Sequence, residues 1–111
     1  MSKKFKNHMS YIGKDLGYKD EAFHFPGWGE SAAKLMIERE VNGLGIDAAS
    51  IDCGNSEDLP THTIFLRTDR YMIENLILDD LPPKGFTFIT MPLKVKGGPE
   101  SEARVMAIVP E

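Results

Sequence analysis

Two ionisable residues lie where the local hydrophobic pattern predicts apolar side chains. His62 shares one face of a predicted helix with Leu59 and Leu66. In the next predicted strand, Glu74 alternates with the hydrophobic residues Met72, Leu76 and Leu78. A buried carboxylate is costly unless it is paired, hydrogen-bonded or bound to a metal. An imidazole nitrogen and a carboxylate oxygen on successive elements are suitable metal ligands, so we consider His62 and Glu74 as a candidate metal site.

Both positions also have structural explanations. A lone histidine on an apolar face is often a core residue that hydrogen-bonds the backbone. Glu74 could cap a loop or pair with one of the arginines Arg67, Arg70 and Arg104. Two protein ligands also fall short of a zinc site, which normally has at least three. The residue pattern alone favours the structural explanation over a metal site.

Other polar residues are weaker candidates. Asp47 and Asp52 flank the end of a predicted strand, where α/β proteins often keep functional groups, but hydrogen bonding to the adjacent loop is the simpler explanation. Cys53 is interpreted as structural, since its acidic neighbour disfavours a thiolate. His8 and His24 lie in irregular segments without a partner at ligand spacing. The sequence contains no nucleophile elbow and no phosphate-binding loop, so we predict neither a catalytic nucleophile nor a bound organic cofactor.

The elements that must position these residues alternate between helix and strand. A helix is predicted over 31–41, with Ser31 as N-cap and one face formed by Ala32, Leu35 and Met36. A short buried strand follows at 44–46, and the polar segment 50–58 forms a loop after it. Helix directly followed by buried strand indicates an α/β fold.

The second half continues with one helix and three strands. Asp58 is predicted to cap a helix over 59–66, and a strand follows at 71–78. Two further strands, 86–95 and 102–109, are joined by a glycine-proline turn. Residues 1–28 are predicted to be an irregular, aromatic-rich arm, and 29–111 the remainder of a single domain.

Composition excludes several classes of function. The chain has 111 residues, a length that supports one domain at most. A net charge of −4 argues against a nucleic-acid partner, and no apolar run is long enough to span a membrane. The single cysteine rules out an intrachain disulfide, and no secretory signal is evident, so we expect a cytoplasmic protein.

Read as one string, the sequence resembles the cyclase family of metal-dependent hydrolases, which includes kynurenine formamidases and isatin hydrolases. The segments that carry the resemblance follow one another in the family's order and spacing. They are Tyr11-Ile12-Gly13, His24-Phe25-Pro26-Gly27-Trp28, Gly45-Ile46-Asp47, Ser50-Ile51-Asp52-x-Gly54-x-Ser56-x-Asp58-x-Pro60-x-His62, Glu74-Asn75-Leu76, Leu81-Pro82, Gly85-Phe86-x-Phe88, Pro92-Leu93-Lys94-x-Lys96-Gly97-Gly98, Arg104 and Ala107.

The resemblance implies the C-terminal part of a swivelling β/β/α fold and hydrolysis of small amides with zinc or manganese. It implies arylformamidase-type chemistry, N-formylkynurenine to kynurenine, in tryptophan catabolism. The family's C-terminal half contributes one histidine and one glutamate to the metal, and these match His62 and Glu74, twelve residues apart. It also implies association with a second copy or another family member.

The sequence departs from the family pattern at the metal site. The family's His-x-x-x-His-x-Asp motif does not occur in these 111 residues, and Arg67-Thr68-Asp69-Arg70 replaces a glycine-containing turn. We therefore expect a truncated chain that binds metal weakly and is inactive unless a family member's N-terminal half complements it. The alternative is a catalytically inactive family member that serves as a binding or structural partner.

Overall fold

The computed structural model describes residues 23–111, which form two compact units divided after Ile77. Most of the predicted aromatic arm, including His8, lies outside the described residues, and the predicted boundary at residue 28 remains a prediction. No helix within residues 23–111 is long and apolar enough to cross a membrane.

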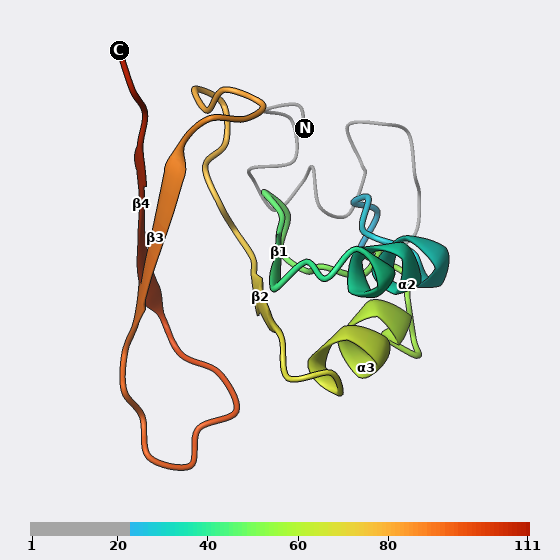
Figure 1. Ribbon diagram of the computed structural model, residues 1–111. Helices are drawn as coiled ribbons and strands as arrows, with labels where there is room; N and C mark the ends of the chain where they lie inside the picture. The colour runs from blue at the N-terminus through green and yellow to red at the C-terminus, as the bar shows by residue number, and fades with distance from the viewer. Residues whose placement is uncertain (1–22) are drawn as a thin grey trace. The chain divides into compact units, whose positions relative to one another are not determined.

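The first unit contains two helices and a pair of short parallel strands (Figure 1). Helix α2 spans Glu30–Glu38 and strand β1 spans Gly43–Gly45. Helix α3, Pro60–Leu66, then leads to strand β2, Tyr71–Ile73. The strands pair in parallel with Leu44 opposite Met72, so α3 and its flanking loops form the crossover between them.

The core of this unit lies around β1 and the loop that follows it. Phe65 from α3 and Ile51 from the loop are fully buried, together with Leu44 in β1. Phe25, from the segment before α2, is also part of this core, and Trp28 packs against it. The predicted aromatic arm therefore contributes at least these two rings to the packing of the described part.

The segment before α2 is bound to the loop after β1 by backbone hydrogen bonds. The N–H of Trp28 donates to the carbonyl of Ile51 at 2.7 Å, and the N–H of Gly54 donates to that of Phe25 at 3.0 Å. Gly27 permits this approach, because a Cβ atom there would lie 2.3 Å from the carbonyl carbon of Asp52. This contact fixes the loop that carries Asp52.

The structure corrects the predicted limits and buried face of the first helix. It begins at Glu30 with Gly29 as N-cap, so Ser31 lies inside the helix and does not cap it. It also ends at Glu38, before the predicted stop at Asn42-Gly43, and Glu40 has a left-handed φ of 56°. Its fully buried side chain is Ala33, whereas Leu35 is exposed.

The structure also corrects the predicted cap of α3 and the length of β2. Leu59 is the N-cap residue, and the side chain of Asp58 makes no capping hydrogen bond. Strand β2 ends at Ile73, because Asn75 takes a left-handed φ of 57° and donates its N–H to the carbonyl of Ala48. Glu74 therefore lies immediately after the strand and not within it.

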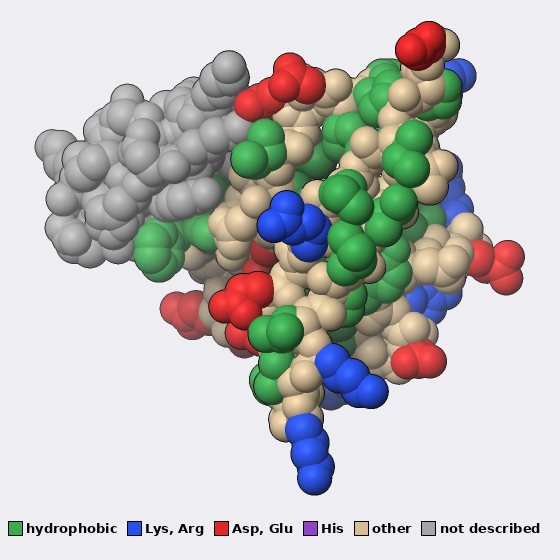
Figure 2. All heavy atoms as spheres, turned by 90° about the vertical axis from the view of Figure 1, so that its left-hand side faces the viewer, with side chains coloured by type: hydrophobic (Ala, Val, Ile, Leu, Met, Phe, Trp, Pro, Cys, Tyr) green, Lys and Arg blue, Asp and Glu red, His purple; other side chains and the backbone are tan. Residues whose placement is uncertain are grey.

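The second unit is an antiparallel hairpin of β3, Thr87–Pro92, and β4, Ala103–Ile108. These strands confirm the predicted pair, with shorter limits. Thr87 pairs with Ile108 and Pro92 with Ala103, so Ile89, Met91, Met106 and Ile108 share one face. Met91, Met106 and Ile108 are exposed, and hydrophobic side chains are visible over the face shown in Figure 2.

Candidate functional site

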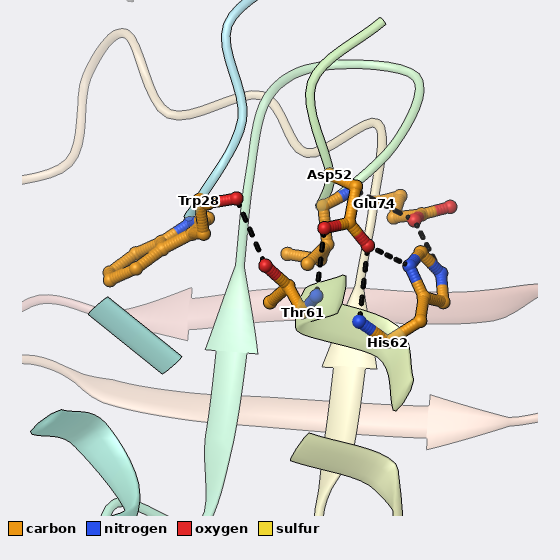
Figure 3. A network of polar contacts seen from close by, with 6 residues as sticks. Trp28, Asp52, Thr61, His62 and Glu74 are labelled. Carbon is orange, nitrogen blue, oxygen red and sulfur yellow. Dashed lines mark hydrogen bonds and ion pairs between the residues drawn. The ribbon is translucent and has the colours of Figure 1, made fainter. Parts of the chain in front are cut away.

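Two carboxylate side chains and one imidazole side chain meet at the N-terminal end of α3 (Figure 3). Asp52 comes from the loop after β1, His62 from the first turn of α3, and Glu74 from the residue after β2. The Nδ1 atom of His62 lies 2.7 Å from Oδ2 of Asp52, and its Nε2 atom lies 3.4 Å from Oε1 of Glu74. Each of the two ring nitrogen atoms of His62 therefore lies near a carboxylate.

Asp52 is the fully buried member of this cluster. Its Oδ1 atom accepts the N–H of Thr61 at 2.8 Å, and its Oδ2 atom accepts the N–H of His62 at 3.1 Å. These are the second and third residues of α3, whose N–H groups have no partner within the helix. Asp52 therefore caps α3 from a neighbouring loop, the role that the sequence pattern had predicted for Asp58.

The pKa of Asp52 reflects two opposing influences. Burial raises it, but the hydrogen bonds with the His62 side chain and with the backbone of Thr61 and His62 more than compensate, and the net pKa lies below the ordinary 3.8. Asp52 is thus an ionised carboxylate at neutral pH. Asp52 thus makes structural hydrogen bonds, but to the first turn of α3 and not to its adjacent loop as expected, and they extend to a candidate metal ligand.

Glu74 is held by the backbone of the Asp52 loop. Its Oε1 atom accepts the N–H of Ile51 at 2.9 Å, and its side chain keeps 28% of its surface exposed. The arginine nearest in sequence, Arg70, is engaged elsewhere: its Nε atom donates to the carbonyl of Val41, and its guanidinium lies over the ring of Phe65. Glu74 therefore faces His62 with part of its carboxylate open to solvent.

The surroundings of His62 differ from the sequence prediction. Leu59 and Leu66, expected to form a buried apolar face with it, are both exposed, and the buried residues of α3 are Thr61 and Phe65. The His62 side chain has 29% of its surface exposed to solvent and borders a shallow depression along α3. It is an accessible histidine held by a carboxylate, which contradicts the alternative of a core histidine.

The predicted alternation around Glu74 continues past the end of β2, with Ile73, which is also half-buried, as the exception. Met72, Glu74, Leu76 and Leu78 are half-buried, whereas Tyr71, Asn75 and Ile77 are exposed. Hydrogen bonds from the N–H groups of Asn75 and Leu76 to the segment after β1 hold the chain in place here, although Asn75 itself has a left-handed φ. The period-two pattern thus placed Glu74 on the correct side of the chain without specifying a regular strand.

His62 and Glu74 have the donor types of a metal site, but they account for only part of one. Among residues 23–111, no group of three or more histidine, cysteine, aspartate or glutamate side chains is placed to hold a metal ion. With Asp52 bound to Nδ1, the Nε2 atom of His62 and the Glu74 carboxylate are the donors that converge. Their donor types fit two metal ligands, fewer than the three protein ligands that a catalytic zinc normally has.

Comparison with known proteins gives the sequence a family. A family model described as a putative cyclase matches residues 2–53. The kynurenine formamidase of Polaromonas naphthalenivorans is 35% identical over 72 residues, which are 65% of this chain and 32% of that protein. The isatin hydrolase of Roseibium aggregatum is 30% identical over 93 residues, or 79% of this chain and 35% of that protein.

Two solved structures resemble the described part. A predicted metal-dependent hydrolase from Bacillus stearothermophilus superimposes with a TM-score of 0.67 and 34% sequence identity. A potential metal-dependent hydrolase with cyclase activity gives a TM-score of 0.63 and 36% identity. Each match covers 78% of this chain and less than half of the other, 42% and 43%.

These matches define an α/β chain with part of the fold of a metal-dependent hydrolase. The chain belongs to the cyclase family and is a relative of kynurenine formamidases and isatin hydrolases, as the sequence motifs predicted. It spans about a third of the length of these curated relatives.

Proposed function

We propose that this chain contributes His62 and Glu74 to the metal centre of an arylformamidase-type amide hydrolase. The observation that carries this proposal is the convergence of Nε2 of His62 and Oε1 of Glu74, 3.4 Å apart on accessible side chains. Several of the relatives are kynurenine formamidases, so N-formylkynurenine is the substrate to test first.

The roles of the two residues follow from their chemistry. His62 would offer the ring nitrogen that Asp52 leaves open, and Glu74 would offer a carboxylate oxygen held in place by the Ile51 N–H. Zinc or manganese bound there would polarise the substrate carbonyl and lower the pKa of a water molecule. The proposal assigns no general base to the residues described.

The proposal requires further ligands from a complementary N-terminal half, in the same polypeptide or in another. Support comes from the cluster itself, which offers two converging donors where a catalytic zinc normally has three protein ligands. A homo- or hetero-oligomer with a family member is one way to supply them. A cytoplasmic location, favoured by the single cysteine, is part of the same proposal.

The first test is N-formylkynurenine hydrolysis and zinc binding by the purified 111-residue chain, alone and mixed with the N-terminal half of a kynurenine formamidase. We expect activity only in the mixture, and we expect His62→Ala and Glu74→Gln to abolish it. Each should weaken zinc binding in the mixture at least about tenfold, since even outer partners of metal ligands contribute that much.

Glu57→Gln is the matched control, because Glu57 is an exposed glutamate in the loop before α3. It should leave both readouts unchanged. Hydrolysis by the chain alone would contradict the requirement for a second half. Absence of zinc binding and of activity in the mixture would reject the proposal and favour the alternative of a binding or structural protein.

A further inference from the structure

The hydrogen bonds of Asp52 exceed what capping a helix requires. A carboxylate that only capped α3 would need the N–H groups of Thr61 and His62, and it receives both. Its shortest contact is a third one, 2.7 Å from Oδ2 to Nδ1 of the His62 side chain. The same oxygen atom therefore holds the backbone and the imidazole ring of one residue (Figure 3).

This third contact defines the proton position on the neutral imidazole. An ionised carboxylate only accepts hydrogen bonds, so Nδ1 of His62 must be the donor. A neutral imidazole has one N–H, and Nε2 then carries the free lone pair. That lone pair lies on the side of Glu74, with Nε2 3.4 Å from Oε1. Two acceptors facing each other at this distance form a site for a cation.

We propose that Asp52 is a positioning residue that holds His62 in the Nδ1–H tautomer and aims its Nε2 atom toward Glu74. The loop after β1 serves both ends of this arrangement, because the Ile51 N–H holds Glu74 and the adjacent Asp52 holds His62. The inference rests on the proposed metal-binding role of His62 and Glu74, which Asp52 would support without touching the metal.

The test uses nitrogen-15 NMR of the histidine rings in the metal-free chain at pH 8, where an ordinary histidine is neutral. The signals of His62 are identified among the three histidines by their loss in His62→Gln. We expect the wild-type chain to show a protonated Nδ1 and an unprotonated Nε2. An Nε2–H tautomer in the wild-type chain would overturn the proposal without any variant at Asp52.

The variant Asp52→Asn tests whether Asp52 determines the tautomer of His62. Asparagine keeps one acceptor oxygen, for the N–H of Thr61, and its NH2 group takes the place of Oδ2, which in the wild type accepts both the backbone N–H and Nδ1–H of His62. The proton should therefore move to Nε2, and zinc affinity in the complemented mixture should fall about 10- to 100-fold. Asp47→Asn is the matched control, since Asp47 is a buried aspartate in the same loop, and it should leave the tautomer unchanged.

The outcomes separate this inference from the proposed function. The expected tautomer without zinc binding in the mixture would reject the metal site and leave the positioning of His62 intact. Zinc binding together with an Nε2–H tautomer would retain the metal site and reject the role of Asp52. If Asp52→Asn does not fold, as judged by circular dichroism, the wild-type tautomer decides alone.

Discussion

The carboxylate of Asp52 connects local chemistry with the stability of the first unit. Burial raises its pKa, but hydrogen bonds from His62 and Thr61 outweigh burial and lower it. When a folded-state pKa lies below the unfolded value, the group stabilises the fold above the unfolded pKa. That contribution is lost as the pH falls through the folded pKa. Since an unfolded aspartate titrates near about pH 3.9, the contribution of Asp52 should be complete at neutral pH.

We therefore expect the free energy of unfolding to decrease on acidification below about pH 4, partly because Asp52 becomes protonated. Asp52→Asn should make the chain less stable at pH 7 and should reduce its further loss of stability in acid. Urea unfolding at a series of pH values between neutral and acid would measure both effects. Parallel pH profiles for the wild type and the variant would show that Asp52 does not contribute to the acid sensitivity.

At the scale of helices and strands, the sequence predicted those features that are set by residues close to one another in the chain. The period-two pattern and the turn residues gave both strands of the hairpin, and proline at the start of α3 placed that helix within one residue. The side of the chain on which Glu74 lies also followed from local alternation. These features are set by periodicity and turn chemistry, which the sequence shows directly.

What the sequence did not show depends on contacts between distant segments. Asp52 caps α3 across nine residues, and local rules favoured Asp58 because it directly precedes the helix. Strand β2 stops early because Asn75 turns to donate its N–H to Ala48. A signal for Asp52 existed in its place after a strand end, but the choice between a structural and a positioning role required the His62 geometry.

The contact between the segment before α2 and the Asp52 loop gives a prediction at the level of these elements. Gly27→Ala would place Cβ 2.3 Å from the carbonyl carbon of Asp52 and 2.4 Å from the nitrogen of Cys53, so backbone must shift. We expect a loss of about 1–3 kcal/mol in the free energy of unfolding, the usual range for overpacking. Denaturant titration would measure it.

Gly29→Ala is the control for Gly27→Ala. A Cβ atom at Gly29 would meet nothing within 4 Å, although this residue is the N-cap of α2. The loss in free energy of unfolding should come only from the weaker capping by alanine, and it should be smaller than that of Gly27→Ala. Equal losses in the two variants would indicate that the contact with the Asp52 loop adds little to stability.

At the scale of the whole molecule, the hairpin of the second unit is a candidate surface for association with another protein chain. A two-stranded hairpin is only marginally stable by itself in water. One face of this hairpin presents Met91, Met106 and Ile108, all at least 45% exposed, with the exposed Arg104 opposite Met91. An apolar surface of this kind is typical of an interaction site. We therefore expect the hairpin face to mediate association of the chain with a second copy or with another family member.

Sedimentation velocity over a range of protein concentrations would test self-association through this face. We expect the wild-type chain to form larger species as concentration rises, and the double variant Met106→Lys with Ile108→Lys to shift the midpoint to higher concentration. Thr87→Lys is the control, because it adds a positive charge at an exposed position directly opposite Ile108. It should reduce association less than the double variant, which also removes the apolar surface. A wild-type chain that stays monomeric at every concentration would contradict self-association, and mixing it with a full-length relative would then test the other partner.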